Sequence, residues 1–305
     1  MQTNTLKTIT LDKWTDYYSL IGQKFNERHW IYRGQSDHNW NLTSSLQRLD
    51  TPHLGDIEKD LLKNYKNNLH LYCDAPLPED TLSYLAHMQH HGTPTRLLDF
   101  TESPIIAAFF AYENIPKFIT FDKTEFIAIW VINISWLKME TIKKLLNDNE
   151  FLLKLKNYSE LDYELFAEQK NSKLDMKLDE EGEMLEKRFF ELLEQNIIRF
   201  FGDFFIDSEH KSNIIYPIKP SMLTERFRKQ RCIFLCSSNL DISFMETLKS
   251  YSNFSDNVFL LRLPKNEREK AFRHFCQHII SRENLFPGID GFAQSLIDSI
   301  PIDGC

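Results

Sequence analysis

Glycine and proline are scarce in this sequence, with 9 and 11 in 305 residues. Such a composition excludes collagen-like and low-complexity chains. No stretch approaches the length of about 18 uninterrupted apolar residues that a membrane span requires. Residues 1–11 lack the basic start and apolar core of a secretory signal peptide. These absences predict a soluble protein of the cytoplasm without a membrane partner.

Positive charge is also in short supply. The formal net charge is −8, whereas general binding to nucleic acid requires clustered Lys and Arg against the phosphates. The acidic balance disfavours a general nucleic-acid binder but is compatible with a local basic pocket, so nucleic acid stays open as a partner.

The cysteines are few and odd in number. There are five, and although only three residues separate Cys232 from Cys236, no second Cys or His pair completes a zinc set. We expect buried or idle thiols and no metal. The sequence also lacks a Gly-x-Ser-x-Gly elbow, a phosphate loop and a dinucleotide fingerprint, so the enzyme classes built on those motifs have no support.

Apolar residues make up 42% of the chain and include 24 Phe, which is enough for a sizeable core. Runs of β-branched and aromatic residues predict strands, and apolar residues at helical spacing predict helices between them. The strands are expected at 29–34, 95–100, 126–134, 214–218, 232–237 and 258–263, and the helices at 11–29, 55–73, 79–90, 105–112 and 271–281. This mixture predicts an α+β fold, with a mixed or antiparallel sheet flanked by helices.

The composition changes near residue 136. Residues 136–200 are rich in Lys, Glu, Asp and Leu and contain no Pro, which predicts two or three amphipathic helices with solvated faces. We interpret about 136–205 as a helical insertion in a single domain over 1–305, whose core covers about 25–135 and 214–298. A helix that binds a protein partner is the alternative interpretation of this stretch.

The first candidate site is Tyr32-Arg33-Gly34, at the expected end of a strand. The glycine would let another backbone or a ligand come close. The arginine offers a planar fork suited to phosphate or carboxylate. The alternative is that Arg33 pairs with a carboxylate of the core.

The second candidate site is the polar segment 89–99, which surrounds a Gly-Thr-Pro break. Histidine can act there as an acid, a base or a donor to phosphate. His87 and His91 have a spacing that zinc could use, but no general-base Glu lies between them, so we expect no metal. For Asp99 the alternative is an ion pair with Arg96 or Arg33 that fixes the loop.

The third candidate site is the basic run 226–231, which precedes a strand. Gln230 can bond to ribose hydroxyls or to an amide but cannot act as a base. The alternative is that these basic residues are simply exposed to solvent where the chain leads into the strand.

Together these segments resemble the FRG domain. Residues 32–37, followed by Trp40 and Leu42, are similar to the motif from which the family takes its name. Residues 89–101 and 103–111 resemble its longest motif, and residues 226–234 and 285–291 its later ones, so that the resemblance extends over about 30 to 292. Cys232 is a departure, because the family usually has Gly at that position.

The order of these segments also resembles the ADP-ribosyltransferase superfamily, where Arg or His precedes Gly on a first strand, a middle strand leads into a helix, and a late strand supplies Glu or Gln. This resemblance implies a split sheet, no required cofactor, NAD as substrate, and ADP-ribosyl transfer or NAD cleavage in a toxin or defence effector. The residues it implies as catalytic are Arg33, His90 and Gln230. The residues expected to bind the nucleotide are Tyr32, Gly34, Gln89, His91, Thr95, Arg96, Asp99 and Arg226.

Two other functions stay open. An amide at Gln230 cannot supply the negative charge that stabilises an oxocarbenium-like transition state, which favours a non-catalytic nucleotide or nucleic-acid sensor. The other function is that of a structural protein, which would bind a partner through its helical insertion. The geometric expectation is that Arg33 faces residues 92–94 across a pocket whose floor is Gln230.

Overall fold

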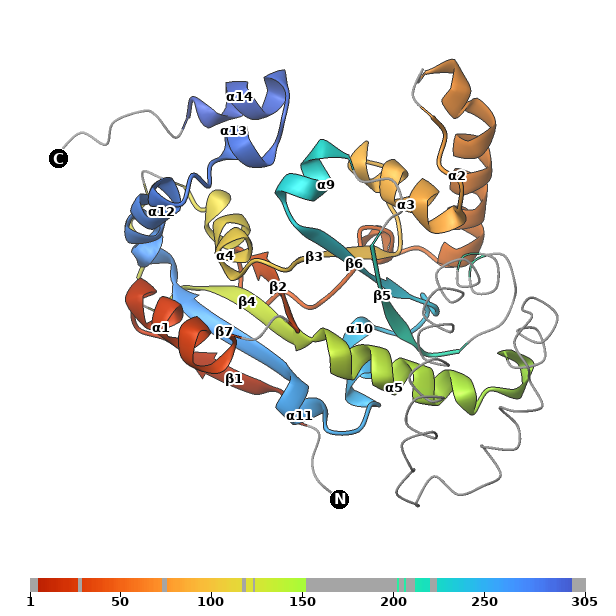
Figure 1. The fold of residues 1–305 in the computed structure, drawn as a ribbon, viewed down its shortest axis with the longest axis horizontal. Coiled ribbons are helices and arrows are strands. Elements are labelled where there is room, and N and C mark those ends of the chain that lie inside the picture. Colours follow the sequence, from red (N-terminus) through yellow and green to blue (C-terminus); the bar gives the residue numbers. More distant parts are fainter. Residues whose placement is uncertain are drawn as a thin grey trace, which may run out of the picture.

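The computed structural model describes residues 5–26, 29–72, 76–116, 119–122, 124–151, 202, 206, 212–219 and 224–297. In this part of the chain, one mixed sheet has the strand order β1-β7-β4-β2-β3-β6-β5 (Figure 1). The strands are β1 Lys7–Thr10, β2 Trp30–Gln35, β3 Leu97–Thr101, β4 Phe126–Asn133, β5 Ile215–Ile218, β6 Cys232–Ser237 and β7 Val258–Pro264. The predicted α+β class is confirmed, and so are the six predicted strands, to within a few residues.

The strand β1 was missing from the sequence prediction. Its residues are mostly exposed, so they show no apolar run, and it pairs in parallel with β7 at the edge of the sheet. All other neighbouring strands are antiparallel. At the opposite edge, β5 contains Pro217, which is tolerated because an edge strand need not donate on both sides.

Helices cover both faces of the sheet, but they cover one face in two separate groups. The first group packs on β2, β4 and β7 and consists of α1 Trp14–Lys24, α4 Pro104–Glu113 and α12 Arg268–Gln277. The second packs on β3, β5 and β6 and consists of α2 Leu54–Asn68, α3 Thr81–His90 and α9 Glu225–Lys229. The other face carries a continuous core under α5 Ile134–Leu146, α10 Phe244–Lys249 and α11 Phe254–Asn257. The later part of α5 also adds Ile142 and Leu145 to the cluster of the second group.

The remaining elements are short. Two helices near the C-terminus, α13 Arg282–Leu285 and α14 Ile289–Ser295, follow α12. Turns of 3-10 helix occupy Gln47–Leu49, Leu69–Leu71 and Lys265–Glu267. Every helix in the described ranges is too short or too polar to cross a membrane.

The helix α5 begins the predicted insertion but belongs to the core. Leu137 and Leu145 are buried, and the Thr141 hydroxyl donates to the carbonyl oxygen of Ile215 on β5 at 2.7 Å. This helix is therefore part of the core and not of the predicted insertion. Most of the insertion's remaining residues, 152–201 and 203–205, lie outside the described residues, so its predicted helices stay a prediction.

The helix α4 forms as its sequence predicts and lies directly on β2. The Ser103 hydroxyl accepts from the backbone N–H of Ile106, and Pro104 occupies the first turn. Gly34 makes this close approach possible, because a Cβ there would clash with the carbonyl oxygen of Ala107 and lie 2.7 Å from the nitrogen of Ala111. The close neighbour allowed by Gly34 is thus the backbone of α4.

We predict opposite effects for the same substitution at two glycines. Gly34→Ala forces α4 off the sheet and should lower the free energy of unfolding by about 1–3 kcal/mol or more. Gly22→Ala lies within α1, where a Cβ meets nothing within 4 Å, and should raise it by about 0.5–1 kcal/mol. Chemical denaturation measures both, and equal effects at the two sites would contradict this packing.

Candidate functional site

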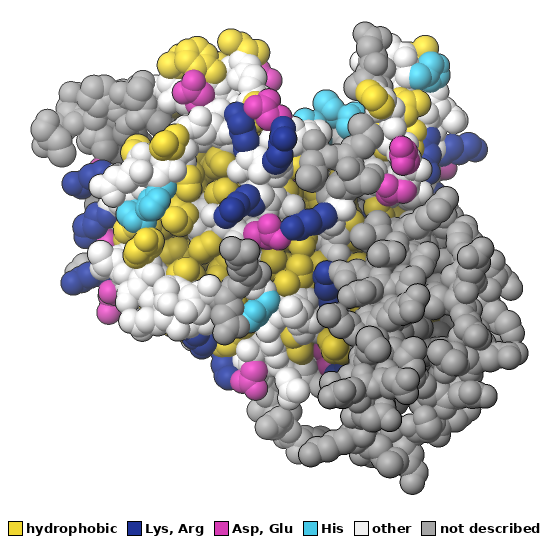
Figure 2. All heavy atoms as spheres, viewed as in Figure 1, with side chains coloured by type: hydrophobic (Ala, Val, Ile, Leu, Met, Phe, Trp, Pro, Cys, Tyr) yellow, Lys and Arg dark blue, Asp and Glu magenta, His cyan; other side chains and the backbone are white. Residues whose placement is uncertain are grey.

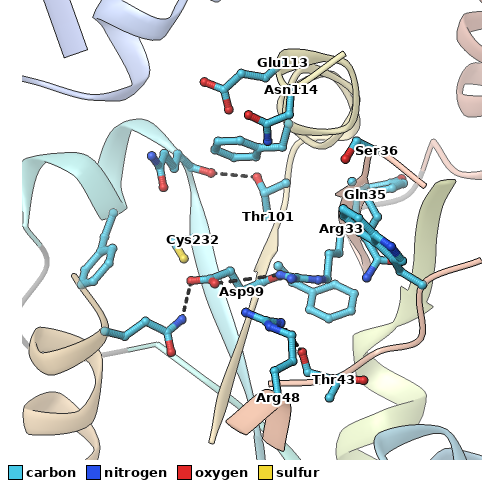
Figure 3. Close-up of a pocket in the computed structure, with 18 of the residues that line it drawn as sticks. Arg33, Gln35, Ser36, Thr43, Arg48, Asp99, Thr101, Glu113, Asn114 and Cys232 are labelled. Atoms are coloured by element: carbon cyan, nitrogen blue, oxygen red, sulfur yellow. Dashed lines mark hydrogen bonds and ion pairs between the residues drawn. The ribbon is translucent and has the colours of Figure 1, made fainter. Parts of the chain in front are cut away.

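The strands β2 and β3 pair at one position and then part. Tyr32 lies opposite Thr101, and the ladder does not continue from there along β2. A cavity of about 810 Å³ opens at this point, between the two groups of helices (Figure 3). Its walls come from β2, the loop 36–48, α3, β3, α4, α9 and β6.

Arg33 bridges the parted strands. It lies in the middle of β2, opposite Trp130 of β4, rather than at the strand end. Its Nη1 donates to the carbonyl oxygen of Asp99 at 2.7 Å and lies 3.9 Å from the Asp99 carboxylate. Burial lowers the pKa of Arg33 and the charge of Asp99 opposes that shift. The Nε atom is buried and has no hydrogen-bond partner among the described residues.

Asp99 presents its carboxylate to the cavity, with 55% of the side chain exposed. One carboxylate oxygen accepts from Nε2 of Gln89 at 2.8 Å. The side-chain oxygen Oε1 of Gln89 accepts in turn from the Thr95 hydroxyl. The backbone N–H of Thr95 donates to the Ser45 hydroxyl, which donates to the Thr95 carbonyl oxygen. Thr95 therefore lies behind the site and supports it, while Gln89 and Asp99 line the cavity.

Two further arginines line the cavity. Arg48 donates to the carbonyl oxygen of Thr43 at 2.8 Å, and its charge contributes to lowering the pKa of Arg33. Arg226 places its guanidinium 4.6 Å from the ring centre of Phe286. The acidic residues of the lining are Asp99 and Glu113, and Glu113 is bound by Arg282. The cavity thus has an excess of positive charge in an acidic chain. Figure 2 shows Lys and Arg side chains in the middle of one face of the molecule, with Asp and Glu side chains among them.

His90 lines the same cavity at the end of α3. Its ring packs on Phe227 at 5.3 Å, and burial, followed by the charge of Arg226, lowers the pKa of His90 to about 4. Nδ1 is buried with no hydrogen-bond partner in the described structure. The imidazole is neutral near pH 7, so it can donate or accept a hydrogen bond but adds no charge.

The other histidines of this segment lie elsewhere. His91 lines a neighbouring cavity, and Nδ1 of His87 is 2.8 Å from the Tyr65 hydroxyl. The described ranges hold no group of three or more His, Cys, Asp or Glu that could bind a metal ion.

Gln230 lines the cavity, but its amide is engaged. Nε2 donates to the carbonyl oxygen of Leu285 at 3.1 Å, while the backbone carbonyl accepts from the Thr101 hydroxyl at 2.8 Å. Gln230 thereby joins β3 to α13. Beside it, Cys232 projects from β6 into the cavity, and burial raises the pKa of its thiol.

Arg96 is placed outside the cavity and is fully buried with Glu58 of α2. Its backbone N–H, Nε and Nη2 all contact the Glu58 carboxylate, and Nη1 donates to the carbonyl oxygens of Ser237 and Ser238. The pair joins α2, β3 and the end of β6. Asp99 therefore interacts with Arg33 and not with Arg96.

Of the predicted site residues, the structure brings eight into one cavity: Tyr32, Arg33, Gly34, Gln89, His90, Asp99, Arg226 and Gln230. Residues 92–94 do not line it, because Gly92, with a φ of 89°, turns the chain away after α3. Sequence reasoning missed Arg48, Glu113 and Trp40, of which Trp40 is 55% exposed on the cavity wall. The signal that was available was the polar loop after β2, which holds both Trp40 and Arg48.

Comparison with known families agrees with the motifs. Residues 28–119 match the model of the FRG domain. Residues 28–119 are an FRG domain. The match includes the β2, loop, α3, β3 and α4 walls of the cavity, whereas α9 and β6 lie beyond it. No curated protein and no solved structure matches the chain.

The low pKa of His90 predicts a specific loss of stability in acid. Between about pH 6.5 and pH 4 the unfolded chain binds a proton at this residue and the folded chain does not. The free energy of unfolding should therefore fall as the pH falls through this window. His90→Gln should reduce this fall in the free energy of unfolding. His70 is exposed, so His70→Gln should leave the fall as it is in the wild type. Equal pH profiles for both variants, measured by denaturation, would contradict the burial of His90.

Proposed function

We propose that the FRG domain binds a nucleotide in the cavity between β2 and β3. The observation that carries this proposal is the position of Arg33 and Arg48, two guanidinium groups close enough for one to lower the pKa of the other. Like charges held together are stabilised by an anion between them. Arginine forks match the geometry of phosphate, and such charge-assisted bonds are the strong ones.

The unpaired atoms of the cavity support the same ligand. Nε of Arg33 and Nδ1 of His90 are buried without partners in the described structure. Buried polar atoms that lack partners are costly, so a ligand that bonds to them gains affinity. Phosphate oxygens accept from Arg33, and a ribose hydroxyl or phosphate oxygen suits the neutral His90.

The wall of the cavity also offers a surface for a base. Trp40 is more than half exposed there, and Phe110 of α4 lines the same cavity. Aromatic faces stack on nucleobases, at about 1–3 kcal/mol per base. A nucleotide would therefore use both the cationic and the aromatic parts of the lining.

For the reaction we propose cleavage of NAD, which fits the likeness to ADP-ribosyltransferases. In this reaction the bond between ribose C1′ and the nicotinamide nitrogen breaks, and nicotinamide leaves with the electron pair. Water or an acceptor hydroxyl then forms the new bond to C1′ and loses its proton to solvent. Asp99 is the residue that supplies negative charge to the oxocarbenium-like transition state, a role that the amide of Gln230 cannot fill. Such an activity suits a toxin or defence effector.

A second candidate function is nucleotide sensing without chemistry. The hydrogen bond from the Gln230 side chain to the carbonyl oxygen of Leu285 favours sensing, because the amide group then connects two elements of the fold and does not contact a ligand. In that case the ligand would be bound and released unchanged.

The binding proposal predicts a selective loss of affinity. Arg48→Gln should weaken ADP binding by about tenfold or more, since a hydrogen bond to a charged group contributes about 1.5–3 kcal/mol. Arg228 is exposed and does not line the cavity, so Arg228→Gln should leave the affinity for ADP unchanged. Isothermal titration calorimetry measures both, with melting temperature alongside. A lower melting temperature for Arg48→Gln without any effect on ADP would support a structural role instead.

The reaction proposal predicts a separation of binding from turnover. Asp99→Asn keeps the bond from Gln89 but removes the charge, so NAD cleavage should fall by about 100-fold or more while ADP binding persists. Glu102→Gln, an exposed acid near the end of β3 that does not line the cavity, should cleave NAD normally. Nicotinamide release measures the rate. Nucleotide binding without any release by the wild type would favour the sensor.

A further inference from the structure

A second cavity of about 590 Å³ adjoins the first. It is bordered by the end of α3, the start of α9, and α13 with α14. His90 and Arg226 line both cavities, so these two side chains form the junction between them. A ligand bound in the first cavity can therefore extend past them into the second.

The junction has the chemistry of an anion site. The Arg226 guanidinium rests on the ring of Phe286, and no carboxylate contacts it within the described residues. His90 beside it is neutral and has a buried, unpartnered Nδ1. An arginine that is fixed by an aromatic ring and lacks a counter-charge is suited to a phosphate group.

The second cavity has a different lining from the first. It contains the carboxylate of Asp290, the carboxylate of Glu225, which is 3.1 Å from Nζ of Lys229, and the amide of Gln294. Its second arginine, Arg282, is already bound by Glu113. Carboxylate and amide oxygens accept hydrogen bonds from hydroxyl groups, and the carboxylates repel a further anion. The lining thus favours a polyhydroxylated group such as a sugar over another phosphate.

We propose that the ligand is a nucleoside diphosphate that carries a second sugar. One phosphate lies at Arg33 and Arg48, the other at Arg226 and His90, and the sugar occupies the second cavity. This inference rests on the proposed nucleotide site and narrows its ligand class. The diphosphate-linked sugar is shared by ADP-ribose and by nucleotide sugars. Because Asp99 lines only the first cavity, a sugar held in the second cavity lies away from it, and this inference belongs to the sensing function rather than to NAD cleavage.

Titration calorimetry with ADP, ADP-ribose and UDP-glucose tests the inference on the full chain. At least one of the two diphosphate sugars should bind about tenfold or more tightly than ADP. Gln294→Trp fills the second cavity and should remove that advantage while the affinity for ADP stays the same. Ala293→Trp, at the neighbouring exposed position outside both cavities, should keep the advantage. ADP-ribose and UDP-glucose then distinguish the two sources of the sugar.

The possible results distinguish a failure of the proposed sugar site from a failure of the proposed nucleotide site. If ADP binds and neither sugar adds affinity, the second cavity is not a sugar site and the nucleotide site stands. An advantage that survives Gln294→Trp also overturns the inference, because the sugar must then lie elsewhere. If neither ADP nor the diphosphate sugars bind, the proposed function fails, and this inference fails with it.

Discussion

The hydrogen bond from Arg33 to the carbonyl oxygen of Asp99 holds together two strands that have already parted. Without it, the polar backbone of β3 at this point would lack the partner that a neighbouring strand normally supplies. The separation also leaves the side of β3 and β6 that carries Asp99, Thr101 and Cys232 facing the cavity. The cavity, its cations and the route to the second cavity all depend on this one interruption of the sheet.

The helices on one face of the sheet are also divided at the point where β2 and β3 part. On this face the core is split into a cluster under α4 and another under α3, whereas the opposite face has one cluster that runs across the parting strands. Gly34 lets α4 lie directly on β2, and the pair of Arg96 with Glu58 anchors α2 against β3. The two halves are thus fixed independently, which allows a hollow to persist between them while the continuous core behind it holds the sheet together.

Local sequence predicted the elements well but predicted their partners poorly. The strands β4, β6 and β7 follow from apolar runs, and the start of α4 follows from Ser103 and Pro104, because these signals lie within a few residues of one another. The edge strand β1 has no such signal and depends on β7, far along the chain. Likewise, Arg96 binds Glu58, which lies 38 residues earlier in the sequence. Arg48 comes near Arg33 only because the loop after β2 folds back over the site. The motifs therefore located the site, and tertiary contacts decided which of their residues face it.

The most direct test of this account is a crystal structure of the chain with bound ADP. The account predicts phosphate oxygens within hydrogen-bond distance of Arg33 and Arg48, in the opening between β2 and β3, with the adenine against Trp40. ADP bound on another surface, or in the cavity with its phosphates turned away from both arginines, would contradict it.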